Sequence, residues 1–232
     1  MKNIVLNIPH SSTNGIFDKE IGGWKPNPYF YNDCVRKWTD WFTDFIFYQE
    51  DENIKSVIFP YSRFVCDVER LKDDPLEEKG QGIIYTHFNN YYRCELDDEH
   101  KAKLYNLWEN HQKLLANSLN KDSILINCHS FPSNMSDCDI CIGYNNDWSY
   151  DSNVVEIIKD EFTKSGYKVY VNSPYSNSIT PKTDFEYKSV MIEVNKRVYM
   201  DEDLVKLSNN QRQWMRWFGM LKRIYEGLMN YE

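Results

Sequence analysis

Two histidines directly follow apolar segments of the sequence, at positions where a metal ion could be bound. His10 closes the segment VLNIPH and precedes Ser11 and Ser12, and His129 closes ILINCH and precedes Ser130. A neutral imidazole is the commonest protein ligand for zinc, and a catalytic zinc keeps one position open for water beside three protein ligands. A capping or structural role explains either histidine alone equally well. Because both occupy the same kind of position, we predict that they bind one zinc ion.

The third metal ligand is left open between two aspartates. Asp33, Asp40 and Asp44 recur at intervals of seven and four residues, which would place them on one helical face. Plain solvated carboxylates would give the same pattern. Thr39 could cap a new helix, and Asp40 would then lie near the carboxyl edge of a sheet. We therefore predict Asp40 as the third ligand, with Asp33 as the alternative.

Glu193 is a charged residue inside SVMIEVNKRVYM, a run that otherwise has the pattern of a buried strand. A lone buried carboxylate is costly, so it needs a partner. A glutamate whose pKa is raised by burial could take a proton from the attacking water and pass it to the leaving nitrogen. The alternative is a structural ion pair with Lys196 or Arg197. We predict that Glu193 is the general base.

The segment YSRFVCDVERL brings two arginines and an aspartate close together in the chain. Arg63, Asp67 and Arg70 follow a short predicted strand. The planar fork of arginine suits bidentate recognition of a carboxylate, as a small acidic substrate would require. The alternative is that Arg63 and Asp67 only pair with each other. We predict a catalytic role for Arg63 and substrate binding by Arg70, and the other predicted substrate contacts are Ser130, Asn195 and Arg197.

These residues need a scaffold that brings strand ends together. Short β-branched runs alternate with longer segments of helical period, which is typical of a mostly parallel sheet covered by helices on both faces. In such a sheet, ligands gather outside the carboxyl ends of the strands. The predicted strands span residues 4–8, 56–59, 123–128, 167–171 and 190–194. The predicted helices span residues 29–48, 97–119, 153–164 and 204–229. We therefore predict a single α/β domain over residues 1–232, with a mixed sheet in a three-layer arrangement.

Two further local features qualify this scaffold. Asn27 followed by Pro28 is a cap and first-turn pair, and the first helix is expected to break near Trp38. Residues 72–94 and 131–151 carry Gly, Pro, Asn and Asp without a clear period, so we predict long loops there. Loops of that length in a compact domain usually cover a site or move.

Composition excludes several classes of function. The chain has 232 residues, 41% of them hydrophobic, and a formal net charge of -8 without a basic block, so we expect no nucleic acid or membrane partner. Pro9 and His10 interrupt the first apolar run before it reaches signal-peptide length, so we expect a cytoplasmic protein. The 6 cysteines are then reduced thiols. Cys138 and Cys141 form the one C-x-x-C pair, which is weak evidence for a second metal site.

The chain resembles the N-formylglutamate amidohydrolase family in short blocks from its beginning to near its end. The matching blocks are IPHSS, TDWFTDFIF, YSRFVCDVER, QGIIYT, LINCHSF and IEVNKRVYMDE. Their order and spacing make the signal specific. The resemblance implies a fold like that of the zinc carboxypeptidases, with His10, Asp40 and His129 at the metal positions and Glu193 as the base. Arg63 and Arg70 match arginines that hold substrate carboxylates or polarise the carbonyl.

The same resemblance implies hydrolysis of a small N-acyl amino acid, with N-formyl-L-glutamate as the first choice. Two departures bear on this substrate: Glu69 stands where family members commonly have Asn, and NSPYSNSIT replaces a loop that often carries a Gly-Gly pair. Both would disfavour a dicarboxylate if they faced the site. His111 falls where the family tends to carry a histidine, for which we expect a buried structural role. Two other functions stay open: a peptide or cell-wall amidase with the same zinc site, and a binding protein that has lost catalysis.

Overall fold

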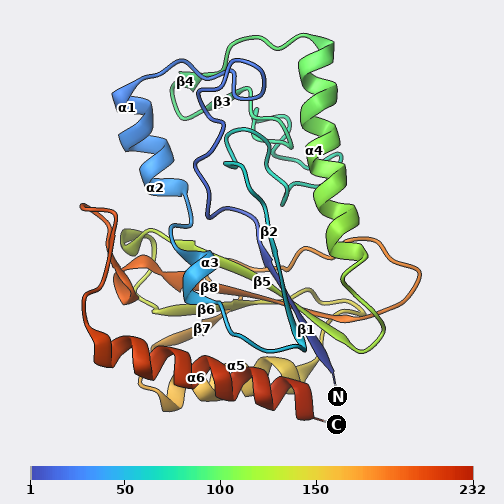
Figure 1. Cartoon of the computed structure of the whole chain (residues 1–232), viewed down its shortest axis with the longest axis vertical. Helices are drawn as coiled ribbons and strands as arrows, with labels where there is room; N and C mark the ends of the chain where they lie inside the picture. The colour runs from blue at the N-terminus through green and yellow to red at the C-terminus, as the bar shows by residue number, and fades with distance from the viewer. Residues whose placement is uncertain (1, 232) are drawn as a thin grey trace. The chain divides into compact units, whose positions relative to one another are not determined.

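Six strands form one sheet in the computed structural model, which describes residues 2–231 (Figure 1). Their order across the sheet is β2-β1-β5-β8-β6-β7. The strands are β1 (Asn3–Ile8), β2 (Ile54–Ile58), β5 (Ser123–Phe131), β6 (Ile140–Gly143), β7 (Val169–Val171) and β8 (Lys188–Asn195). β5 runs parallel to both β1 and β8, whereas β6 is antiparallel to β8 and parallel to β7. The sheet is therefore mixed and mostly parallel, as predicted.

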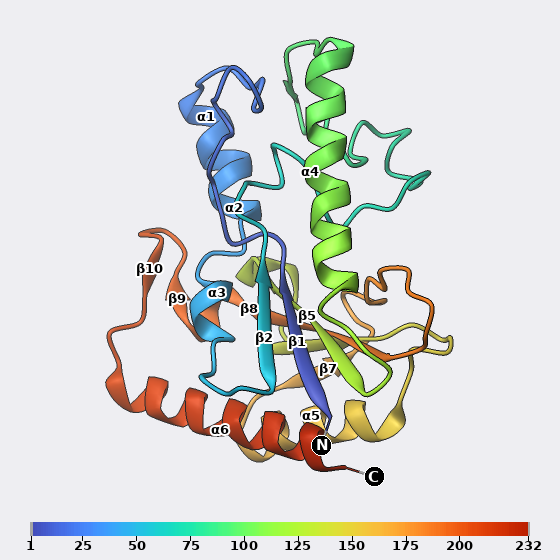
Figure 2. The same cartoon turned by 45° about the vertical axis from the view of Figure 1, so that its right-hand side comes forward.

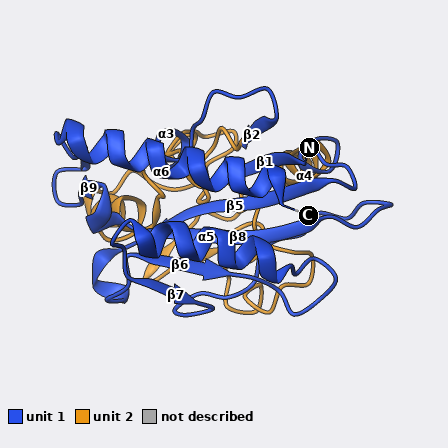
Figure 3. Cartoon of the chain, turned by 90° about the horizontal axis from the view of Figure 1, so that it is seen from below, with its two compact units in different colours: residues 1–8, 42–57, 115–232 blue, residues 9–41, 58–114 orange. Residues whose placement is uncertain are grey.

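The described chain divides into two compact units, which Figure 3 shows in different colours. Unit 1 takes in the described parts of residues 1–8, 42–57 and 115–232 and contains the sheet. Unit 2 takes in residues 9–41 and 58–114. The single domain over residues 1–232 stays a prediction.

Two amphipathic helices of unit 1, α5 (Ser152–Lys164) and α6 (Gln211–Asn230), lie along one face of the sheet (Figures 1 and 3). The buried residues of α6 repeat at three- and four-residue spacing, so they form one apolar stripe: Trp217, Met220, Leu221, Ile224, Tyr225, Leu228 and Met229. Two side chains of this stripe also fix the segment at the end of helix α3 (Thr43–Ile46). Trp217 donates to the carbonyl of Ile46 at 2.7 Å, and Tyr225 donates to that of Phe47 at 2.9 Å.

β1 and β5 lie side by side in this sheet (Figure 2), and their pairing fixes which side chains share a face. Asn7 pairs with Asn127, and successive strand residues point to opposite faces. Asn127 and His129 therefore share one face, and Cys128 points to the other. Cys128 lies close enough to Tyr225 of α6 to raise the pKa of that buried phenol further, so the face of Cys128 is the one that α6 covers.

The five predicted strands are confirmed, with ends that differ by at most three residues. The predicted loop over 131–151 is wrong in part, because β6 lies inside it. All four residues of β6 are buried. Cys138-Asp139 precede this strand and a polar segment follows Gly143, so the apolar run is too short to show the period of a strand. The predicted loop over 72–94 contains a small hairpin, β3 (His87–Phe88) and β4 (Tyr91–Tyr92).

The helix predictions hold in type and differ in their bounds. Residues 97–119 form α4 (Asp98–Ala116), and residues 153–164 form α5. The predicted start of the last helix at Leu204 is wrong, because the short strands β9 (Met200–Asp201) and β10 (Lys206–Leu207) pair there and Asn210 caps α6. Two 3-10 turns, Ser133–Met135 and Lys196–Val198, follow β5 and β8.

The first helical segment is broken, as predicted. Asn27 caps α1 (Pro28–Phe30), which continues through a π-helical turn, Tyr31–Val35, into α2 (Arg36–Trp38). The prediction that Thr39 caps the next helix is wrong. Thr39 is extended after α2, and α3 begins only after Phe42, whose φ of 62° lies in the left-handed region. This break separates Asp33, Asp40 and Asp44, so they do not share a helical face.

Unit 2 has an aromatic core in place of a large sheet. Trp24 stacks on Phe30 with ring centroids 4.4 Å apart, and Phe64 packs edge-on against both rings. Arg93 is buried in this unit, where its guanidinium donates to the carbonyls of Val65 and Ile21. Arg93 thereby satisfies backbone acceptors in loops that have no strand partner. In residues 2–231, the helices are too short or too polar to cross a membrane.

Candidate active site

His10 lies in unit 2, two residues after the end of β1, with 2% of its surface exposed. Its carbonyl accepts a hydrogen bond from the backbone N–H of Asp40 at 3.0 Å. In the ring, Nε2 lies 2.8 Å from Asp67 Oδ1, and Nδ1 lies 3.7 Å from Asp40 Oδ2. The position of this histidine is therefore fixed by both its backbone and its side chain.

Asp67 is the centre of a buried charge network in unit 2. Its side chain is 0% exposed, and its Oδ2 atom lies 3.0 Å from Arg63 Nη2 and 3.6 Å from Arg70 Nη2. The hydroxyl of Tyr85 also donates to Oδ2, and the backbone N–H of Glu69 donates to Oδ1 at 3.1 Å. Burial alone would raise the pKa of Asp67, but Arg70, Arg63 and His10 outweigh it and hold that pKa well below the ordinary value. Asp67 is therefore an ionised carboxylate.

The ionised Asp67 determines which nitrogen of His10 could bind a metal. An ionised carboxylate only accepts hydrogen bonds, so Nε2 of His10 must carry the proton that it donates to Asp67. In a neutral imidazole, Nδ1 then keeps its lone pair. A histidine ligand that donates its other N–H to a carboxylate is the usual arrangement around catalytic zinc. The donor set around His10 therefore fits a metal ion.

Two carboxylates of unit 2 lie near enough to share such an ion with His10. Asp40 is the predicted ligand, is 3% exposed and lies 3.7 Å from Nδ1. Glu69 is half-buried, and a ligand atom of its carboxylate lies within 4.8 Å of one on His10. Asp33, the alternative in the sequence, instead accepts a hydrogen bond from Tyr91 at 2.6 Å at the surface.

In unit 1, strand register brings the other histidine next to the predicted base. His129 on β5 is the register partner of Glu193 on β8, and Glu193 is in turn the partner of Cys141 on β6. Paired residues point to the same face, so the three side chains lie in a row across three strands. His129 is 3% exposed and Glu193 is 8% exposed. This row places a candidate ligand and a candidate base side by side.

Of the two ion pairs given as the alternative to a general base, the one between Glu193 and Arg197 is not seen among the described residues. Arg197 instead binds Asp139, with Nη2 3.0 Å from Oδ1, and donates to the carbonyls of Ser136 and Asp137. Asn195 donates to the carbonyls of Ser136 and Cys138 and caps the turn that contains Arg197. Both residues therefore hold the segment 136–139.

Ser130 is also predicted to bind the substrate. It follows His129 directly on β5, so it points to the opposite face, and it is 6% exposed. The structure does not bring Ser130 to the face of His129 and Glu193.

The two predicted arginines are brought together in unit 2 by Asp67. Burial would lower the pKa of Arg63, but Tyr85, Asp67 and Asp40 keep it well above the ordinary value. Asp67 likewise raises the pKa of Arg70, which also donates to the carbonyl of Gln81 at 3.1 Å. Both guanidinium groups therefore stay charged beside His10.

His111 is buried on α4, with its ring edge-on to Phe59 at 5.4 Å between centroids. Burial lowers the pKa of His111 to about 4, against an opposing effect of Glu69. It is therefore neutral at pH 7, and its structural role stays a prediction.

The six thiols are all free, and five of them are buried. Cys138 and Cys141 belong to an apolar cluster with Phe131. Burial and the nearby Glu193 raise the pKa of Cys141 to about 11, so its thiol stays protonated at neutral pH. These properties are those of structural thiols.

The loop NSPYSNSIT is tied to the sheet of unit 1 by a buried polar network. Asn127 donates to the hydroxyl of Ser178 at 2.7 Å, and that hydroxyl lies 2.7 Å from the hydroxyl of Ser189. Asn7 donates to Asn127 at 2.8 Å, and Asn145 donates to the carbonyl of Ser178 at 2.8 Å. This loop is thus fixed to β5 and β8 by side chains rather than by a Gly-Gly turn.

Glu69 and Tyr85 are residues of this site for which the sequence predicts no role. In the sequence, Glu69 is only an added negative charge, two residues after Asp67 in the same short block. The sequence gives no periodic signal for this role, because residues 67–70 form a turn in which the backbone N–H of Arg70 donates to the carbonyl of Asp67 at 3.2 Å. Tyr85, in the block QGIIYT, gives no signal either, because a tyrosine is usually a core residue.

Comparisons with known proteins identify the family and the fold of this chain. The family profile for N-formylglutamate amidohydrolase matches residues 2–200. An N-formylglutamate amidohydrolase from Ralstonia eutropha JMP134 has a similar structure, with a TM-score of 0.77 and 16% identity over 98% of this chain and 92% of that chain. A gene product of Agrobacterium tumefaciens is similar with a TM-score of 0.66 and 13% identity over 98% and 90% of the two chains. No curated protein matches the sequence.

The two structural similarities, at such low identity, concern the fold, and they confirm the predicted fold class. The family match covers most of the chain and supports an enzyme that hydrolyses amide bonds. The chain belongs to the N-formylglutamate amidohydrolase family.

Proposed function

We propose that this protein hydrolyses the amide bond of a small N-acyl amino acid, with N-formyl-L-glutamate as the first candidate substrate and formate and L-glutamate as products. Family membership supports amide hydrolysis in general. The observation that carries the proposal furthest is the register pair of His129 and Glu193, because it sets a metal-binding side chain beside a carboxylate on adjacent strands.

The proposed cofactor is one zinc ion bound by His10, His129 and a carboxylate. Asn7 and Asn127 are register partners, and the two histidines follow them by three and two residues along parallel strands. The ends of parallel neighbours lead to the same edge of a sheet. Asp40 and Glu69 are the two choices for the carboxylate. When bound, zinc would supply a Lewis acid that polarises the carbonyl and lowers the pKa of water.

Glu193 is the proposed general base and acid. It would take a proton from the attacking water and then donate it to the nitrogen that leaves as the amine. Its place in the middle of the sheet, 8% exposed, keeps most water away from this carboxylate. Its two strand neighbours, His129 and Cys141, limit the positions that it can take.

Arg63 and Arg70 are proposed to act on the negative charge of the substrate. Arg63 would stabilise the oxyanion, and Arg70 would bind a substrate carboxylate. Asp67 holds both guanidinium groups and so prevents either from turning away. For Asn195 and Arg197 we propose a positioning role through the segment 136–139 in place of direct substrate contact.

The test is an assay of amine release by zinc-loaded protein. N-formyl-L-glutamate, N-acetyl-L-glutamate and N-formyl-L-leucine are each incubated with the protein, and the free amino acid is measured. The proposal expects turnover of the formyl compounds, with glutamate preferred over leucine by about tenfold, or about 1.4 kcal/mol. Absence of turnover with all three would leave a binding protein as the better explanation.

A further inference from the structure

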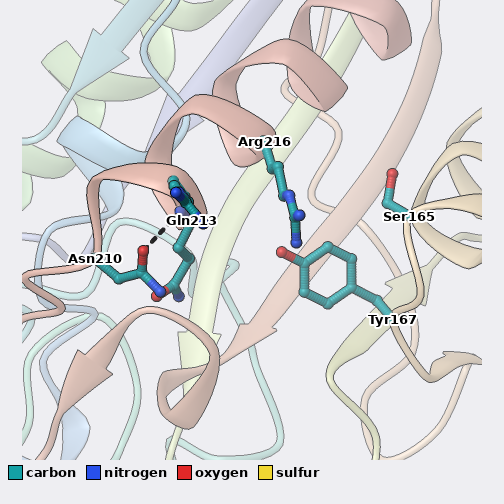
Figure 4. Close-up of a pocket in the computed structure, with 6 residues that line it drawn as sticks. Ser165, Tyr167, Asn210, Gln213 and Arg216 are labelled. Carbon is teal, nitrogen blue, oxygen red and sulfur yellow. Dashed lines mark hydrogen bonds between the residues drawn. The ribbon is translucent and has the colours of Figure 1, made fainter.

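Unit 1 contains a pocket of about 440 Å³ whose lining shares no residue with the candidate active site (Figure 4). It is formed by the first turns of α6 and by the chain that follows α5, and its lining residues are Ser165, Tyr167, Asn210, Arg212, Gln213 and Arg216. Small-molecule sites commonly measure about 300–1,000 Å³. The pocket is therefore large enough for a small ligand.

Two arginines dominate the charge of this pocket. Arg212 and Arg216 are four residues apart on α6, so they lie on the same face of the helix. Neither forms an ion pair with a carboxylate anywhere in residues 2–231. By contrast, Arg223 on the same helix lies 2.8 Å from Glu161 Oε2. Both arginines are exposed and have no carboxylate partner in the described chain, so their guanidinium groups are available to bind an anion from solution.

The hydroxyl of Tyr167 adds a third donor. Figure 4 shows the side chain of Arg216 pointing toward this hydroxyl. Burial raises the pKa of Tyr167, and Asp139 raises it further, so the phenol keeps its proton. Asp139 does not compete for the pocket arginines, because its carboxylate binds Arg197 and accepts the backbone N–H of Lys168 at 2.9 Å.

The acceptor groups of the lining are already used inside the protein. Asn210 Oδ1 accepts from the backbone N–H of Gln213 at 3.2 Å, and Gln213 Oε1 accepts from Ser208 at 2.7 Å. What the pocket offers a ligand is thus a set of donors: two guanidinium groups, a phenol and the hydroxyl of Ser165. Such a set is complementary to a group with several anionic oxygens.

We propose that this pocket binds a small dianion, either a phosphate group or a dicarboxylate, through Arg212, Arg216 and Tyr167. Two guanidinium forks match two negative charges, and each fork can make two parallel hydrogen bonds. This inference does not rest on the proposed hydrolase activity, because it uses a different set of residues.

Isothermal titration calorimetry on the full chain tests the proposal with inorganic phosphate in one arm and glutarate in the other. Arg212→Gln and Arg216→Gln are each expected to weaken binding about tenfold or more, because each removes a charge-assisted contact. Tyr167→Phe is expected to weaken it about threefold, since it removes one neutral donor. Binding in only one arm identifies the ligand class, and binding in both also supports the site.

Lys222→Gln is the matched control, because it removes the same charge from an exposed position of α6 outside the pocket. It should leave the affinity within about twofold of the parent protein. The proposal is overturned if neither anion binds with a Kd below about 10 mM. It is equally overturned if the Arg212→Gln/Arg216→Gln double variant binds like the parent, or if Lys222→Gln weakens binding as much as Arg216→Gln. Circular dichroism on each variant shows whether it is folded.

Discussion

The two units hold their candidate catalytic residues by different means. In unit 1, His129 and Glu193 are neighbours because β5 and β8 pair in one register, and this register is shared by eight residue pairs along the two strands. In unit 2, His10 is held by Asp67, a single carboxylate that also binds Arg63 and Arg70. A register survives the loss of one side chain, whereas a network built around one carboxylate does not. Substitutions in unit 1 should therefore change chemistry, and those in unit 2 should change chemistry and stability together.

Glu193→Gln gives the largest expected effect. The amide keeps the size of the side chain but cannot take up a proton, so turnover should fall about 10³- to 10⁴-fold, which corresponds to about 4–5 kcal/mol in the barrier. Steady-state assays of amine release measure this loss, and zinc content and circular dichroism should match the parent protein. Near-full activity in a folded, zinc-loaded variant would remove Glu193 as the base.

Asp67→Ala should lower the free energy of unfolding by about 3 kcal/mol, because it leaves the half-buried Arg63 and Arg70 without their shared partner. It should also weaken zinc binding about 10- to 100-fold by releasing the ring of His10. Urea unfolding and zinc titration measure the two effects. Asp139→Asn, which breaks a more exposed pair with Arg197 in unit 1, should cost about 1 kcal/mol or less. Equal losses for the two variants would remove the contrast between the units.

His111 should make the stability of unit 2 depend on pH. Its pKa of about 4 in the folded chain lies below its ordinary value of 6.5, so the unfolded chain takes up the proton first. The contribution of neutral His111 to the free energy of unfolding is therefore complete above pH 6.5. It is lost as the pH falls to 4, by up to about 3 kcal/mol. Urea unfolding at several pH values, with chelator present so that metal release does not contribute, measures this loss. His111→Gln should flatten the dependence, and an unchanged slope would disprove the assignment.

Glu69→Gln and Asp40→Asn decide which carboxylate binds the metal. Substitution of the true ligand should lower the zinc affinity about 100-fold or more. Substitution of a carboxylate that only orients His10 should lower it about tenfold. The proximity of Glu69 and Asp40 to His10 makes both substitutions informative. Competition with a zinc-binding dye measures both values. If neither variant loses affinity, unit 2 supplies no carboxylate ligand.

Arg197→Gln should give the smallest effect. Because its guanidinium binds Asp139 and two carbonyls of the segment 136–139, KM for the substrate should change by less than about threefold. A tenfold rise in KM with kcat unchanged would restore the direct substrate contact predicted from the sequence.

The sheet of unit 1 was predictable because its strands are apolar runs bounded by polar segments. β5 and β8 were recognisable, and so was the position of Glu193 as an isolated charge in a buried strand. β6 was not, since four residues are too few to show a period. Ser130 shows a related difficulty: adjacency to His129 in sequence places it on the opposite face of the strand.

Unit 2 was much less predictable. Its candidate site depends on contacts between loop residues that are distant in the chain, such as His10 with Asp67 and Asp67 with Tyr85. No periodic pattern reports such contacts. The resemblance to a family pointed to His10, Asp40, Arg63 and Arg70, but it did not indicate that Asp67 binds three of them. The role of Glu69 depends on the same folded arrangement.

Zinc content per chain tests the central claim most directly, namely that His10 and His129 bind the same ion. Purified parent protein and its Glu193→Gln variant should each carry about one zinc per chain, whereas His10→Gln and His129→Gln should each lose nearly all of it. The account is contradicted if either histidine variant remains folded and keeps the zinc content of the parent.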